Sequence, residues 1–171
     1  MRILTLTTPD VENGKGCRVT IWAAGCMHHC PECQNKHAWD YNQGELLLDK
    51  SVMDKIFSEV SKDYIEGITL SGGDPLYQSE DSLDDLLKFI KEFKQKFPQK
   101  DIWIYSGFTY EELVIDQKKK EILSLCDVLI DGKFIKHLYD PDLAFRGSAN
   151  QRIIDLQKTL TSGKAEILDI K

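Results

Sequence analysis

The sequence lacks both a long apolar segment and an excess of basic residues. No apolar run approaches the roughly 20 residues that a membrane-spanning helix needs, and the first 16 residues lack the apolar core of a signal peptide. The net charge is −6, from 28 acidic and 22 basic residues, and the lysines are scattered along the chain. We therefore expect a cytoplasmic protein that binds neither membranes nor nucleic acids.

Cysteine is also scarce, with five among 171 residues. An odd number cannot form a fully paired disulfide framework, and the reducing cytoplasm disfavours disulfides. A chain of this length can bury a core without disulfides or structural metals, so clustered cysteines indicate metal binding or redox chemistry. We predict a single domain over residues 1–171, with an N-terminal extension over 1–16 and a C-terminal tail over 157–171.

Strand-like and helix-like patterns alternate along the chain. Strand character is found at 18–24, 67–71, 101–105 and 128–130, and less regularly at 152–156 and 166–170. Helical spacing follows Ser51, covers 82–97 and follows Thr109, and both Ser51 and Thr109 begin capping-box patterns. The alternation predicts an α/β fold with an open, curved, mainly parallel sheet of repeated βα units. Because a closed barrel needs roughly 250 residues, we expect a partial barrel, with a flat flavodoxin-like sheet as the alternative.

Loops with unusual residues follow the first four predicted strands. The segment GCMHHCPECQN follows the first, GGDP at 72–75 the second, SG at 106–107 the third and DGK at 131–133 the fourth. The carboxyl ends of parallel strands meet at one edge of a sheet, where α/β proteins bind their ligands. We therefore predict that the four loops form one site.

Three of the five cysteines lie within one loop, as Cys26-x3-Cys30-x2-Cys33. A 4Fe-4S cluster accepts four ligands, so three thiolates would leave one iron open to a substrate. Structural zinc is the alternative, completed by one of three histidines: His28, His29 or His37. The chain has no second CxxC pair, which a zinc ribbon would contain. If the cysteines hold a cluster, we expect His28 and His29 to be bystanders.

The glycine pair Gly72-Gly73 interrupts the second strand with residues that can adopt a positive φ and let a ligand approach the backbone. Asp74 then presents a carboxylate. On the same edge as three cysteines, this turn is a candidate site for a bound ammonium group.

The combination of CxxxCxxC after one strand and a GG-acid loop after the next resembles the radical S-adenosylmethionine (SAM) enzymes. Within them, the chain resembles the activating proteins of anaerobic ribonucleotide reductase. This further resemblance lies in the cysteine segment and in four blocks: SGGDPL (71–76), DIWIYSG (101–107), DVLIDGKF (127–134) and FRGSANQR (145–152). It covers most of the chain from 14 to 155.

The resemblance implies an enzyme, a radical SAM oxidoreductase that activates a glycyl-radical enzyme. Three cysteines would hold one 4Fe-4S cluster, and SAM would chelate its fourth iron. One electron from a low-potential donor such as a flavodoxin would then yield a 5'-deoxyadenosyl radical. That radical would take a hydrogen from a backbone glycine of the reductase's glycyl-radical subunit. No catalytic residue beyond the cluster and SAM is implied.

The resemblance also assigns SAM contacts. Gly72, Gly73 and Asp74 would meet the methionyl amino end, through backbone carbonyls or the carboxylate. Ser106 would touch the SAM ribose or carboxylate, or would form a plain strand-end turn.

The segment Glu32, Cys33 and Gln34 would pass the adenine and offer it backbone hydrogen bonds. Many superfamily members carry an aromatic residue at the position of Glu32. Arg146 and Arg152 would pair with a carboxylate, or the segment between them would dock the reductase.

Three alternative functions remain at this point. The chain would activate a different glycyl-radical enzyme, act on a small molecule such as a deazapurine precursor, or serve as a zinc-stabilised binding module without catalysis.

Overall fold

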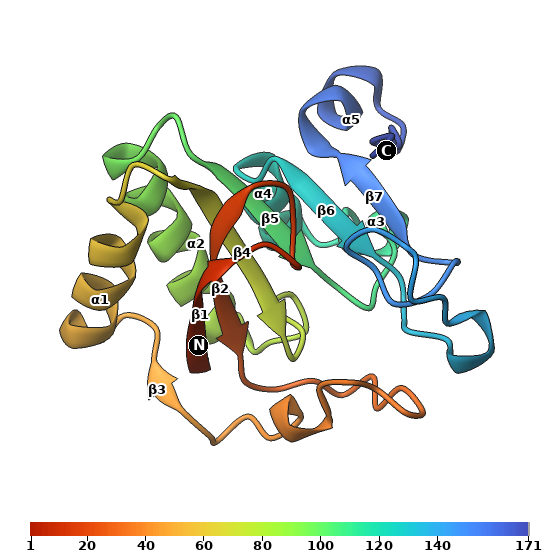
Figure 1. Cartoon of the computed structure of the whole chain (residues 1–171), viewed down its shortest axis with the longest axis horizontal. Helices are drawn as coiled ribbons and strands as arrows, with labels where there is room; N and C mark the ends of the chain where they lie inside the picture. The colour runs from red at the N-terminus through yellow and green to blue at the C-terminus, as the bar shows by residue number, and fades with distance from the viewer. Residues whose placement is uncertain (171) are drawn as a thin grey trace.

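A computed structural model describes residues 1–170 as one open, seven-stranded sheet with helices, and so confirms the α/β class (Figure 1). The strand order is β3-β1-β2-β4-β5-β6-β7. The strands are β1 (Arg2–Asp10), β2 (Cys17–Ala23), β3 (Glu45–Leu46), β4 (Ile65–Gly72), β5 (Asp101–Tyr105), β6 (Val128–Asp131) and β7 (Arg152–Asp155). The helices are α1 (Lys50–Val60), α2 (Glu80–Lys96), α3 (Tyr110–Leu113), α4 (Gln117–Ser124) and α5 (Leu156–Ser162), with 3-10 turns η1 (Lys36–Ala38) and η2 (Lys136–Leu138).

The sheet is mixed, and only its centre is parallel. Strands β2, β4, β5 and β6 pair in parallel, whereas β1, β3 and β7 pair antiparallel. The sequence predicts a mainly parallel sheet because it overlooks β1, which falls in the expected N-terminal extension. The expected strand over 166–170 is reduced to a single bridge between Ile154 and Ile167.

The helices begin and end close to the predicted positions, with two differences. Asp49, not Ser51, caps α1, and its side chain accepts a hydrogen bond from the Ser51 backbone N–H. The capping box of Thr109 is present, but its helix α3 ends at Leu113. A new helix, α4, then begins with Asp116 as its cap.

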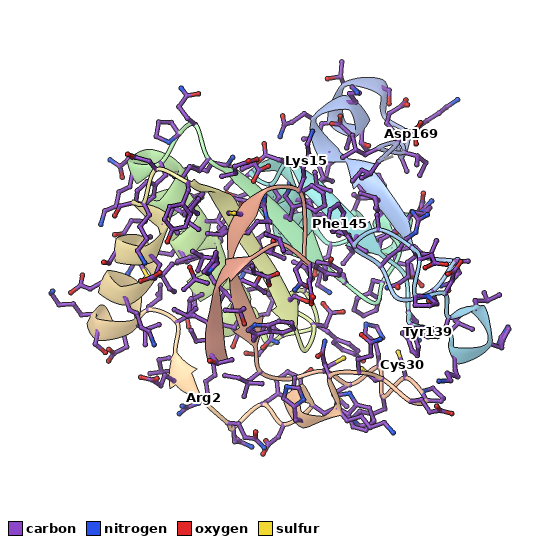
Figure 2. All side chains as sticks on the ribbon, in the orientation of Figure 1. Arg2, Lys15, Cys30, Tyr139, Phe145 and Asp169 are labelled. Atoms are coloured by element: carbon purple, nitrogen blue, oxygen red, sulfur yellow. The ribbon has the colours of Figure 1, made fainter. Side chains whose placement is uncertain are left out.

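The two faces of the sheet differ in chemistry. One face packs against α1, α2 and α4 through a continuous apolar core that includes Ile21, Leu70 and Ile104. Alternate residues on the same strands face the other way and are largely polar or aromatic, as Trp22 and Tyr105 show. The arrows in Figure 1 point to the carboxyl ends of the strands. The loop that contains Cys30, labelled in Figure 2, lies at the carboxyl ends of β2 and β4. No helix within residues 1–170 is long and apolar enough to cross a membrane.

Candidate functional site

The loops at the carboxyl ends of β2, β4, β5 and β6 line one cavity of about 110 Å³. Its wall includes Cys33 from the first loop, Gly73 from the second, Ser106 from the third and Lys133 from the fourth. The predicted convergence of the four loops is therefore confirmed. It follows from the parallel pairing of the four strands, whose carboxyl ends lie at one edge.

The cysteine loop starts at Gly25 and folds back on itself. Gly25 has a φ of 96°, and a Cβ atom there would lie 2.0 Å from the ring of Tyr41. His29 and Glu32 also have positive φ values, 46° and 55°. Such conformations are costly for residues other than glycine and gather at functional sites. These reversals of the chain bring all three cysteine side chains to the same cavity.

The three thiols could hold an iron-sulfur cluster. The Cys33 sulfur accepts a hydrogen bond from the backbone N–H of Asn35 at 3.3 Å. Burial raises the pKa of the Cys26 thiol to about 11 and also raises the pKa of Cys30, so iron must displace a proton from each. Within residues 1–170, no three His, Cys, Asp or Glu side chains are already drawn together as metal ligands.

Asp74 joins the glycine loop to its neighbours through a buried carboxylate, which is 2% exposed. Its Oδ1 accepts a hydrogen bond from the backbone N–H of Leu76 at 2.9 Å. Its Oδ2 lies 2.9 Å from Nε2 of His28, and accepts the Ser106 hydroxyl at 3.0 Å and the Gly107 N–H at 2.8 Å. Because both oxygens are engaged, the carboxylate organises the loops. The backbone of the glycine pair is left as the candidate contact for a ligand.

His28 has contacts within the fold that the sequence does not predict. Its ring packs against Tyr77 at 4.9 Å and Phe108 at 4.6 Å, and its Nε2 faces Asp74 instead of the cysteines. His29 packs against Trp39 with tilted rings. No local pattern marks His28, because both aromatic neighbours come from segments far along the chain. The same geometry argues against His28 as a fourth zinc ligand.

The chain matches the family model of a 4Fe-4S single cluster domain over residues 12–154. It is 41% identical over 145 residues to the anaerobic ribonucleoside-triphosphate reductase-activating protein of Enterobacteria phage T4, a match covering 84% of this chain and 87% of the phage protein. It is 39% identical over 150 residues to the Escherichia coli K12 protein of the same name, a match covering 86% of this chain and 94% of that protein. It is 41% identical over 155 residues to the Haemophilus influenzae protein of this name, a match covering 90% of this chain and 97% of that protein.

This chain belongs to the anaerobic ribonucleoside-triphosphate reductase-activating protein family. The matched region contains the whole cysteine loop and the glycine loop.

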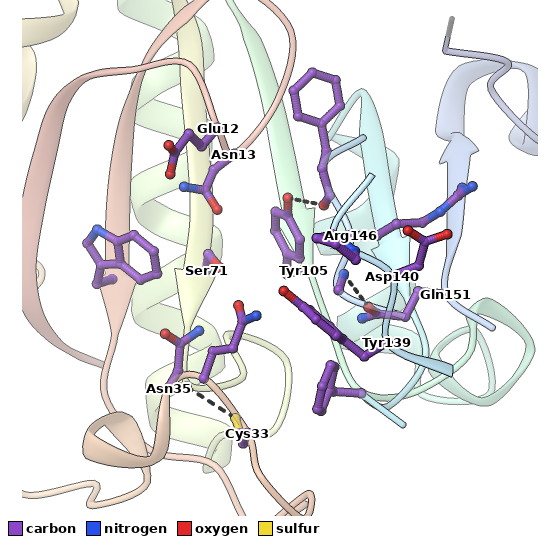
Figure 3. A pocket seen from close by; sticks show the side chains of 16 residues that line it. Glu12, Asn13, Cys33, Asn35, Ser71, Tyr105, Tyr139, Asp140, Arg146 and Gln151 are labelled. Atoms are coloured by element: carbon purple, nitrogen blue, oxygen red, sulfur yellow. Dashed lines mark hydrogen bonds between the residues drawn. The ribbon is translucent and has the colours of Figure 1, made fainter. Parts of the chain in front are cut away.

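In this member of the activating-protein family, the cysteine loop also borders a larger cavity of about 430 Å³ (Figure 3). This cavity lies on the face of the sheet that carries Trp22 and Tyr105. Cys33 and Ser71 line both cavities, so the two are adjacent. Gln34 lines the larger one. Glu32 lies outside both linings, and its exposed carboxylate pairs with Lys136 at 3.1 Å.

The two arginines singled out in the sequence differ in their surroundings. The guanidinium of Arg152 donates hydrogen bonds to the carboxylates of Asp131 and Glu111. Its capacity for bidentate pairing is therefore used within the chain. Arg146 lines the larger cavity but not the smaller one, and its buried Nε has no hydrogen-bond partner in the part of the chain that the structure describes. Figure 3 shows its side chain extending away from Cys33. Of the two arginines, Arg146 is therefore the better candidate for a contact with another molecule.

Proposed function

We propose that this chain activates an anaerobic ribonucleoside-triphosphate reductase by forming a glycyl radical in it, with a 4Fe-4S cluster and SAM as cofactors. The proposal is supported by the single cavity that three thiols and a glycine pair share in a chain of this family. When bound, the cluster supplies the electron that splits SAM into methionine and a 5'-deoxyadenosyl radical, which takes a hydrogen from a backbone glycine of the reductase.

The chain's own residues bind and orient these groups. Three iron ligands are proposed: Cys26, Cys30 and Cys33. The backbone of Gly72 and Gly73 receives the methionyl ammonium group, because the neighbouring Asp74 carboxylate is already engaged. Ser106 supports the site through its hydrogen bond to Asp74.

The larger cavity takes the adenosyl part of SAM and the glycine segment of the reductase. The backbone of Glu32, Cys33 and Gln34 passes the adenine, and Gln34 already lines this cavity. The four parallel strands form the wall of a partial barrel of the radical SAM type. The reaction takes place in the cytoplasm, and a low-potential protein such as a flavodoxin donates the electron.

Anaerobic reconstitution with iron and sulfide tests the proposal. We expect brown protein with about four irons per chain, reductive SAM cleavage, and a glycyl-radical EPR doublet in added reductase. Changing any one of the three proposed ligands to Ala should abolish SAM cleavage. Cys17→Ala, at the far end of β2, is the matched control and should retain it. Intact cleavage in all three ligand variants would contradict the ligand assignment.

Other outcomes would identify a different function. SAM cleavage without a radical in an authentic reductase would indicate another glycyl-radical enzyme or a small molecule as the target. Colourless anaerobic protein with stoichiometric zinc would indicate a binding module.

A further inference from the structure

We propose that His28 is a positioning residue that fixes the cysteine loop against the glycine pair, and that SAM binding depends on it. The inference rests on the function proposed above. It concerns a side chain that lies between the first two cysteines of the motif and points to Asp74.

The imidazole of His28 is buried more deeply than its position in a loop requires. Its side chain is 4% exposed, whereas His37, in the same connection, is exposed. The ring contacts Tyr77 and Phe108, whose own centroids lie 4.9 Å apart. These three rings come from the loops after β2, β4 and β5. His28 thus packs against both of the other loops.

The hydrogen bond between His28 and Asp74 is important because the Asp74 carboxylate is buried. A buried carboxylate is costly unless donors surround it. Its Oδ2 has three, namely Nε2 of His28, the hydroxyl of Ser106 and the N–H of Gly107. One oxygen atom therefore connects the cysteine loop, the glycine loop and the loop after β5. Loss of His28 would remove the only one of these three donors that comes from the cysteine loop, while the backbone N–H of Asp74 would still donate to the carbonyl of Gly25 at 2.9 Å.

Two glycines show how closely these loops approach each other. A Cβ atom at Gly107 would lie 2.4 Å from Cδ2 of His28. A Cβ atom at Gly73 would lie 2.4 Å from the carbonyl oxygen of Gly25, which opens the cysteine loop. Neighbouring backbone thus contacts the cysteine loop at its beginning and at His28. These contacts fix the position of the cysteine loop relative to the glycine pair. They therefore also fix the positions of the thiols that precede and follow His28 in the sequence.

Removal of the imidazole leaves all three cysteines able to take up iron, but beyond Gly25, whose carbonyl still accepts from the N–H of Asp74, it loosens the hold of their loop on the glycine loop. Loss of a group that orients metal ligands typically costs about 10- to 100-fold in affinity or activity. We expect the SAM dissociation constant of His28→Ala to rise by about this factor, while the iron content stays unchanged. The KM for SAM should rise more than kcat falls, because saturating SAM can restore the geometry.

The experiment compares reconstituted full-length wild type with three variants at this position and one control. His28→Ala removes packing and donor, His28→Gln keeps a donor, and His28→Phe keeps a ring without a donor. His37→Ala is the control. SAM affinity is read from the change that SAM causes in the EPR spectrum of the reduced cluster. Hydrogen exchange of residues 26–33 is measured before and after reconstitution. His28→Gln should recover most of the affinity, and His28→Phe should not.

The outcomes separate this proposal from the proposed function. SAM affinity and loop exchange in His28→Ala equal to those of His37→Ala would overturn it, and so would wild-type affinity in His28→Phe. If His28→Ala does not fold, the Gln and Phe variants decide. If wild type neither binds nor cleaves SAM, the proposed function fails. Faster exchange of residues 26–33 in His28→Phe than in His37→Ala would even then support His28 as the tether of the loop.

Discussion

A guanidinium nitrogen of Arg18 lies 2.6 Å from a carboxylate oxygen of Asp101, across two strand boundaries. Arg18 is on β2 and Asp101 begins β5, with β4 between them. The Arg18 side chain is wholly buried and also donates to the Thr69 hydroxyl at 2.8 Å and to the carbonyl of Ile68 at 2.7 Å. This cation therefore holds three strands together at the end of the sheet remote from the cysteine loop.

Asp101→Ala should destabilise the fold because it leaves the buried guanidinium of Arg18 without its counter-ion. Removing one partner of a buried ion pair typically costs about 3–5 kcal/mol. The Asp101 carboxylate is 40% exposed, so we expect a loss of about 2–3 kcal/mol in the free energy of unfolding. Glu121→Ala, which breaks the exposed pair with Lys91, should cost less than about 1 kcal/mol. Equal urea midpoints for the two variants would contradict this prediction.

Gly73→Ala should impair SAM cleavage far more than stability. The added methyl group would meet the carbonyl oxygen of Gly25, which is backbone and cannot rotate away, so the two loops must separate. A displacement of about 1 Å can cost about 100-fold in rate, and we expect a loss of that order. Gly163→Ala is the control. It has a φ of 73° with nothing within 4 Å, so it adds only about 1 kcal/mol of backbone strain.

Cleavage rates at fixed SAM concentration, together with thermal unfolding, measure both effects. Cleavage by Gly73→Ala as fast as by Gly163→Ala would show that the close approach of the two loops is not needed.

The sequence predicts the shared edge of the site because its signals are local. Apolar runs identify β2, β4, β5 and β6, and each run ends in residues that break a strand. The parallel arrangement then brings their loops together. By contrast, β1 is missed because Thr5 and Thr7 are exposed and Pro9 interrupts the pattern. Its strand character depends on pairing with β2, which no local pattern records.

Long-range contacts explain why the roles of individual residues were harder to predict. Asp74 reads as a ligand group in the sequence, but two of its partners, His28 and Ser106, come from distant parts of the chain. His28 reads as a spare residue between cysteines, although its burial depends on Tyr77 and Phe108. The spacing of cysteines therefore indicates the ligand set, while the tertiary fold determines which neighbours orient it.

Acid should weaken the fold in part through Glu111. Hydrogen bonds from Arg152 hold the pKa of the Glu111 carboxyl below its ordinary value. The folded state therefore favours the ionised form, and this stabilisation is present above the unfolded pKa of about 4.3 and lost as the pH falls through the folded value. The carboxylate is largely exposed, so the effect should stay below about 1 kcal/mol.

Urea midpoints of wild type and Glu111→Gln between pH 6 and pH 3 measure this contribution. The difference between the two proteins should shrink as the pH falls, whereas Glu45→Gln, at the exposed strand β3, should follow wild type throughout. A constant difference across the range would rule out the ion pair with Arg152 as the cause.

Arg146→Ala should separate SAM cleavage from activation of the reductase. Arg146 lines the larger cavity but not the one that contains the cysteines and the glycine pair, and its buried Nε has no hydrogen-bond partner among residues 1–170. Arg152, by contrast, is committed to Asp131 and Glu111. We therefore expect Arg146 to contact the reductase.

In Arg146→Ala, SAM cleavage without reductase should match wild type, whereas the glycyl-radical EPR signal should fall about 10-fold or more. This is the loss expected for an interface arginine worth more than about 1.4 kcal/mol. Lys164→Ala, on the exposed segment after α5, is the control and should leave both measurements unchanged. A parallel loss of SAM cleavage and radical formation in Arg146→Ala would instead place this arginine at SAM.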